Sequence, residues 1–199
     1  MQICVCGWHY YPKFYDTLSV IGINFDIVIV AHRAGCTSGM PFITRENSGL
    51  EWGAYSYFLD HHWDKLSSVL FMHDDTEVNP VFFNEIASIS NDLTFVFENE
   101  RDFHFMYTHG RVFMASARFL KAVQSQDGIW YDKGNKGFIT DSARTEKPPA
   151  GCQDHNAGIR AFTVQAEKIV NRHPSFSVNK PFFSDNIKYG IRGKIKKER

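Results

Sequence analysis

Short apolar runs recur along the chain, and each has about the length of a β-strand. The clearest is 27–30, four β-branched residues in a row, a pattern typical of strands buried on both faces. Apolar runs predict four strands: 2–8, 24–31, 67–72 and 93–97. Residues 110–124 are expected to form a short strand that leads into a helix.

Mixed segments between these runs carry helical patterns. A short helix fits within 10–22, and residues 51–63 place large apolar side chains at helical spacing. Asn79 and Pro80 predict the start of another helix, because Asn caps helices and Pro suits their first turn. Strands that alternate with helices predict an α/β fold with a mostly parallel central sheet flanked by helices.

Other segments lack this periodicity. Residues 33–50 and 127–153 are rich in Gly and polar residues and are expected to be loops, and a final helix is expected at 154–170. We therefore expect one domain at 1–175, followed by a basic tail at 176–199.

Composition narrows the class of protein. The chain has 22 basic and 22 acidic residues, and this zero net charge argues against a general nucleic-acid binder. Its four cysteines form no Cys-x-x-Cys pair, which favours free thiols and a cytoplasmic location. Six Lys or Arg residues lie in 188–199, where they either contact anionic lipid or form a solvated end.

Polar residues follow the predicted strands. His9 and Arg33 come just after the first two strands, and His73, Asp74 and Asp75 follow the third. Ligands bind beyond the carboxyl ends of strands in open α/β sheets, so we expect an anionic ligand here, held through Mg²⁺ or Mn²⁺. Strand alternation predicts that Asp74 points away from His73 and Asp75. The alternative is that both aspartates only cap a turn.

A family resemblance appears in two segments. The apolar strand that ends in His-Asp-Asp at 73–75 resembles the Asp-x-Asp element of GT-A-type glycosyltransferases. Upstream, Asn47, Gly49, Glu51 and Gly53 resemble the pattern of the rhamnan-synthesis and capsular-polysaccharide branch. The resemblance implies a single GT-A-like, Rossmann-like domain whose central strand ends at a metal and a sugar nucleotide.

Two downstream segments extend the resemblance. Residues 108–120 are similar to the acceptor-side segment of these enzymes, and 153–162 to their Glu-Asp-x-x-Leu-x-x-Arg motif. Asp154 and Arg160 keep that motif, whereas its Glu and Leu positions are changed. His73 stands where the Asp-x-Asp element has its first carboxylate.

The resemblance implies a metal-dependent glycosyltransferase that moves a sugar from a nucleoside-diphosphate sugar to a glycan or other hydroxyl acceptor. Asp154 would be the general base of an inverting displacement. Three residues would bind Mn²⁺ or Mg²⁺: Asp75, His73 and His173. Six would contact the donor nucleotide: His9, Arg33, Asn47, Gly49, His73 and Asp74.

Alternatives remain for the chain and for single residues. The alternative to a glycosyltransferase is a non-catalytic relative that binds a nucleotide sugar or a glycan within a larger assembly. A metal-dependent hydrolase ranks last, because such sites usually have further His or Asp ligands at recognisable spacing, and His-Asp-Asp has none. Asp154 would also serve as a helix N-cap, and Gly49 as a site of tight backbone packing. The alternative for Arg33 is a solvated surface residue without a ligand, and the alternative for His173 is a structural role.

Overall fold

The structure is a computed structural model of the 199-residue chain. It describes residues 1–32, 39–46, 50–74, 76, 78–96, 112–125, 169, 172 and 174–179.

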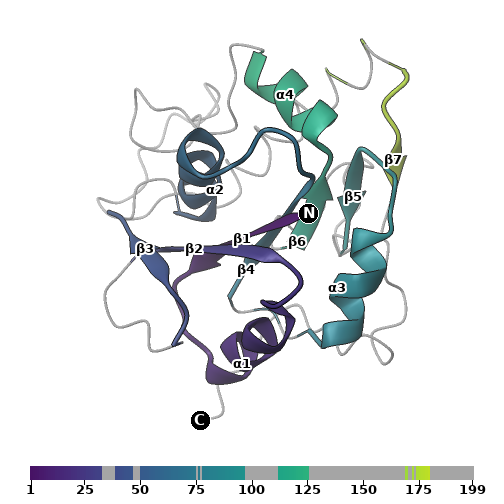
Figure 1. Ribbon diagram of the computed structural model, residues 1–199. Coiled ribbons are helices and arrows are strands. Elements are labelled where there is room, and N and C mark those ends of the chain that lie inside the picture. The colour runs from purple at the N-terminus through teal and green to yellow at the C-terminus, as the bar shows by residue number, and fades with distance from the viewer. Residues whose placement is uncertain are drawn as a thin grey trace, which may run out of the picture.

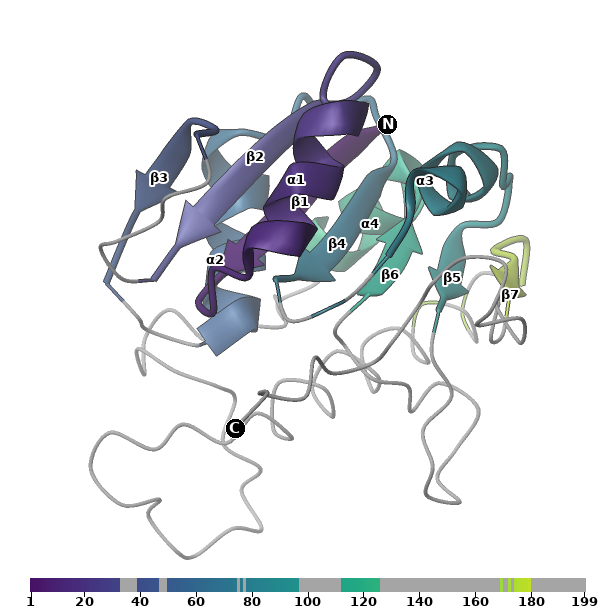
Figure 2. The same ribbon diagram turned by 90° about the horizontal axis from the view of Figure 1, so that it is seen from below.

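A seven-stranded sheet forms the centre of the described chain. Its strands are β1 (Gln2–Gly7), β2 (Asp26–Ala31), β3 (Phe42–Thr44), β4 (Val69–His73), β5 (Leu93–Phe95), β6 (Val112–Ala115) and β7 (Val178–Asn179). They lie in the order β3-β2-β1-β4-β6-β5-β7, as Figure 2 shows from below. Strand β6 is antiparallel to both neighbours, and the other pairs are parallel. The predicted mostly parallel sheet is confirmed.

Helices cover both faces of the sheet. They are α1 (Pro12–Ile21), α2 (Leu50–His61), α3 (Pro80–Ala87) and α4 (Ala117–Ser125). Figure 1 shows α2 and α4 on one face and α1 and α3 on the other, and each pair packs into a separate apolar cluster. The predicted α/β class is therefore confirmed. Within the described ranges, no helix combines the length and apolar character needed to cross a membrane.

Aromatic rings on the α2 face hold the middle of the sheet. Phe71 of β4 stacks on Phe113 of β6, with ring centroids 4.8 Å apart. The ring centroid of Tyr55 on α2 lies 5.0 Å from that of Phe71, and Trp52 stacks on Phe113 with ring centroids 5.8 Å apart. All four side chains are fully buried, and such large rings dominate the free energy of core packing. Strand β4, whose carboxyl end carries His73, is therefore firmly positioned.

Most predicted elements are confirmed with slightly shorter bounds. The helix predicted at Asn79 begins there, since the Asn79 side chain accepts a hydrogen bond from the Phe82 N–H at 3.3 Å. The loop predicted for 33–50 was wrong in part, because β3 lies within it. This strand is three residues at the sheet edge with Phe42 and Thr44 exposed, so no apolar run marks it.

Strand β7 was also not predicted. It pairs with β5 and extends the sheet beyond residue 175. The predicted loop 127–153 lies outside the described residues, as do residues 180–199 and all but Ile169 of the predicted helix 154–170. The division into a domain and a tail therefore stays a prediction.

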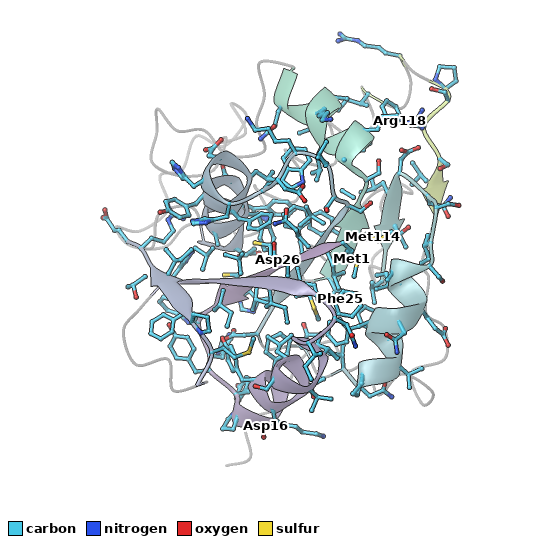
Figure 3. All side chains as sticks on the ribbon, in the orientation of Figure 1. Met1, Asp16, Phe25, Asp26, Met114 and Arg118 are labelled. Carbon is cyan, nitrogen blue, oxygen red and sulfur yellow. The ribbon has the colours of Figure 1, made fainter. Side chains whose placement is uncertain are left out.

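Asp92 fastens β7 and α4 to this end of the sheet. Its buried carboxylate accepts hydrogen bonds from the Ser116 hydroxyl at 2.7 Å, the Arg118 Nε–H at 3.1 Å and the Ser177 backbone N–H at 3.0 Å. Arg118, labelled beside α4 in Figure 3, also lies 4.5 Å above the ring of Phe176. Burial alone raises the pKa of Asp92, but the hydrogen bonds from Arg118, Ser177 and Ser116 outweigh burial and hold the pKa below its usual value.

Asp92→Asn is expected to lower the free energy of unfolding by about 2 kcal/mol at neutral pH, because an amide cannot accept from donors on both sides. The carboxyl pKa is lower in the folded than in the unfolded state. The contribution of this carboxylate to the free energy of unfolding is therefore fully present above its unfolded-state pKa of about 4. It is lost as the pH falls through its lower, folded-state pKa. Urea unfolding across this range measures both effects. Asp16→Asn, a change of an exposed carboxylate on α1, is the control. A deficit of Asp92→Asn that stays constant with pH would contradict the assignment.

Candidate functional site

The candidate site lies where the strand order reverses. The chain places β2 and β3 on one side of β1 and then returns to place β4 on the other side. Cys6 of β1 is in register with His73 of β4, so the two parallel strands end at the same level. Crevices outside such switch points are the usual ligand sites of open α/β sheets.

The carboxylate of Asp74 joins these two strand ends. Its Oδ2 accepts hydrogen bonds from the backbone N–H groups of Trp8, His9 and Tyr10 at 2.9, 2.8 and 2.7 Å. The Tyr15 hydroxyl donates to the same oxygen at 3.1 Å. Successive N–H groups that converge in this way form a nest, which is a favourable place for an anion. Here the anion is supplied by the chain itself, and Asp74 is fully buried.

The loop after β1 is shaped to accept this carboxylate. Tyr10 has a φ of 58°, a left-handed conformation that is uncommon and strained for a bulky residue. Its N–H bond to Asp74 offsets that strain. A Cβ atom at Gly7 would come within 3.2 Å of the Tyr10 ring and of the Tyr15 hydroxyl oxygen. Glycine at this position therefore allows the close approach of the two tyrosines.

His9, His73 and Asp74 form a group that fits a metal ion, since one ligand atom of each lies within 4.8 Å of the others. The Nδ1 of His73 is 3.7 Å from Oδ1 of Asp74, and the two histidine rings are 5.4 Å apart. The predicted divergence of His73 and Asp74 is therefore wrong. Strand β4 ends at His73 and the chain turns there, so strand alternation no longer applies to Asp74.

Cys6 is buried in β1, in register with His73, and its thiol is unsuited to chemistry. Burial raises the pKa of its thiol well above the usual value, and the nearby carboxylates of Glu51 and Asp74 raise it further, against a smaller opposing effect of Arg45. A protonated, buried thiol is neither a nucleophile nor a metal ligand. We infer a packing role for Cys6.

Sequence reasoning missed Tyr15, whose hydroxyl reaches Asp74 across 59 positions of sequence. No local pattern marks such a contact. The predicted acceptor-side segment 108–120 places Ser116 and Arg118 on Asp92. Ala115 is in register with Val69, the first residue of β4, whereas His73 is the last. The side chains of Ser116 and Arg118 therefore lie near the opposite end of β4 from His73.

The structure thus brings together His9, His73 and Asp74 among the predicted site residues. Six others lie outside the described residues: Arg33, Asn47, Gly49, Asp75, Asp154 and His173. Their roles stay predictions.

Asp74→Ala is expected to cost about 3 kcal/mol of stability, because several backbone N–H groups lose their acceptor in a partly buried loop. Amide hydrogen exchange of Trp8, His9 and Tyr10 is expected to accelerate. The control is Asp16→Ala, which removes an exposed carboxylate from α1. Unchanged exchange at these three amides in Asp74→Ala would show that the loop does not depend on the carboxylate.

Comparisons with known proteins give structural likeness without a family. No protein-family model and no curated protein matches the chain. A Bacillus anthracis protein described as a glucose-1-phosphate thymidylyltransferase, crystallised with a sucrose, is similar over 90% of this chain and 86% of its own at 11% identity (TM-score 0.48). The inositol-1-phosphate CTP transferase of T. maritima is similar over 63% and 74% at 14% identity (TM-score 0.41).

The glycosyltransferase GlyE of Streptococcus pneumoniae is similar over 90% of this chain and 45% of its own at 10% identity (TM-score 0.46). The chain therefore spans less than half of the GlyE structure. These solved structures are named as nucleotidyl- and glycosyltransferases. At such scores the likeness adds nothing to the strand order described above, and the rhamnan-synthesis and capsular-polysaccharide branch stays a prediction.

Proposed function

We propose that this chain is a metal-dependent glycosyltransferase that moves a sugar from a nucleoside-diphosphate sugar to a hydroxyl of a glycan or other acceptor. The observation that carries the proposal is the group of His9, His73 and Asp74 at the switch point between β1 and β4. This is where α/β sheets bind nucleotides. Both histidines are only partly buried, so the group is open to a ligand.

The charge of the site supports the proposed requirement for a cation. Asp74 occupies the backbone nest after β1. A diphosphate bound at this loop would therefore lie next to a carboxylate instead of next to free N–H groups. A carboxylate and a diphosphate held close together in a partly desolvated site would repel each other. A bound divalent cation would neutralise this repulsion and stabilise the charge that develops on the leaving diphosphate.

The filled nest also favours sugar transfer over nucleotidyl transfer. Backbone N–H groups in loops and at helix N-termini are the usual cradle for the phosphates of a bound nucleotide. The N–H groups of Trp8, His9 and Tyr10 are already bonded to Asp74. A triphosphate would therefore lack this cradle and, because of its greater charge, would be repelled by Asp74 more strongly than the diphosphate of a nucleotide sugar.

In the proposed reaction, the bond between the anomeric carbon and the diphosphate oxygen breaks, and its electron pair leaves with the diphosphate. The acceptor oxygen forms a bond to the anomeric carbon, and its proton passes to a carboxylate, which we assign to Asp154 from the family resemblance. His9 and His73 orient the diphosphate from the ends of β1 and β4.

The finer parts of the proposal come from sequence. Asp75 and His173 would add metal ligands, and Arg33 and Asn47 would contact the nucleotide, with Gly49 in the same segment. Mn²⁺ and Mg²⁺ are the expected ions. The basic residues of the tail would contact anionic lipid at the cytoplasmic face of a membrane if the acceptor is anchored there.

Thermal unfolding with a panel of nucleoside-diphosphate sugars, with Mn²⁺ or with a chelator, tests the proposal. At a hundredfold excess over Kd, a donor that binds the folded chain stabilises it by about 2.7 kcal/mol, and this gain is expected only when Mn²⁺ is present. The free sugar is the control ligand. The absence of a shift with every donor would rule the proposal out.

Asp154→Asn is expected to keep the donor-dependent shift while lowering sugar transfer or donor hydrolysis about 100-fold or more, because a general base contributes about that much. Release of nucleoside diphosphate measures the rate. Donor binding without release in either protein would favour the non-catalytic relative.

A further inference from the structure

From the geometry, we infer that His9, His73 and Oδ1 of Asp74 together bind a divalent transition-metal ion such as Mn²⁺, Co²⁺ or Zn²⁺ in preference to Mg²⁺. The inference rests on the proposed function for the role of the ion. It assigns His9 as a metal ligand that no sequence motif indicates.

The distances favour a shared ion over a direct bond. The 3.7 Å between Nδ1 of His73 and Oδ1 of Asp74 is too long for a hydrogen bond, since such bonds are about 2.7–3.2 Å. Two ligands that each lie about 2.1 Å from one ion in tetrahedral geometry would be roughly 3.4 Å apart, slightly closer than the two atoms are here. All three ligand atoms lie within 4.8 Å of one another, so small side-chain rotations suffice to close the site.

Asp74 is fixed with one oxygen directed toward the histidines. Its Oδ2 accepts three backbone N–H groups and the Tyr15 hydroxyl. Its Oδ1 accepts a longer bond of 3.1 Å from the His9 N–H and lies beside the ring of His73. An oxygen held in this way is oriented before the ion arrives, as the supporting residues of metal sites commonly ensure.

The ring of His9 is also held in place. Its own backbone N–H is bonded to Asp74, and its ring stacks on Tyr11 with centroids 5.5 Å apart and planes 8° from parallel. His73 is the last residue of the buried strand β4. Both imidazoles are therefore carried by firmly positioned backbone, which reduces the entropy lost when they bind an ion.

The donor set decides which ion is preferred. Two imidazole nitrogens and one carboxylate oxygen suit Co²⁺ and Zn²⁺ best and are also accepted by Mn²⁺, whereas Mg²⁺ prefers oxygen ligands and retains its water. The His73 side chain is 16% exposed and that of Asp74 is fully buried, so the protein encloses the ion from one side. Water or a diphosphate oxygen would be able to reach a bound ion from the exposed side.

The test is a titration of the full chain, without nucleotide, with Co²⁺ followed by its visible absorption and with Zn²⁺, Mn²⁺ and Mg²⁺ by calorimetry. We expect one Co²⁺ or Zn²⁺ per chain and binding of Mg²⁺ at least about tenfold weaker. His9→Gln and His73→Gln are each expected to weaken Co²⁺ binding at least about tenfold and to change its spectrum. His61→Gln, a change of an exposed histidine at the end of α2, is the matched control.

Urea unfolding in the presence of a chelator shows whether each variant folds. If a variant does not fold, the Co²⁺ spectrum of the wild-type chain tests the ligands instead. Absorption bands that show only oxygen ligands, without nitrogen, would overturn the inference. Unchanged binding in His9→Gln, or equal affinity for Mg²⁺ and Co²⁺, would also overturn it.

The outcomes separate this inference from the proposed function. Ion binding that requires His9 and His73, without any effect of nucleoside-diphosphate sugars, would support the site and reject the transferase. Donor binding that is the same with Mg²⁺ as with Mn²⁺ and is unaffected by His9→Gln would reject the site and support the transferase.

Discussion

The carboxylate of Asp74, buried against the backbone N–H groups of residues 8–10, is the interaction on which the candidate site depends. It connects the turn after β4 to the loop after β1, across the strand pair where the sheet order reverses. The same bonds fix the backbone of His9 and hold Tyr10 in its left-handed conformation. Because the chain fills its own anion nest, the site carries negative charge where a phosphate-binding loop would be positive.

The polar interactions at the two ends of the central strands have different roles. At the carboxyl edge, β1 and β4 end level with each other and bring His9 beside His73. At the opposite edge, Asp92 binds Ser116, Arg118 and Ser177 and so holds α4 and β7. The stacked rings of Phe71 and Phe113 lie between these edges and join β4 to β6. Polar interactions at one edge thus stabilise the fold, while those at the other also prepare a site.

Sequence alone predicted the parts of the structure that local patterns determine. Buried strands such as β2 and the capped start of α3 follow from apolar runs and from Asn79. Short edge strands such as β3 and β7 do not, because they form by pairing with neighbours. The carboxyl-end rule placed His9 and His73 at one edge. It did not give the role of Asp74, since its bonds to Trp8, His9 and Tyr10 span 64 to 66 positions.

His73 stands where the Asp-x-Asp element that this segment resembles has a carboxylate, and this changes the charge balance of the proposed site. An imidazole ligand adds no negative charge, and the charge of Asp74 is already shared among the N–H groups that it binds. An ion held mainly by charge would therefore bind weakly to the chain alone, whereas nitrogen coordination compensates for part of the missing charge. The diphosphate of the donor would supply the rest. Because coupling between two ligands is reciprocal, each would then increase the affinity for the other. In the proposed reaction, the ion would therefore be bound most tightly when the diphosphate whose charge it would stabilise is present.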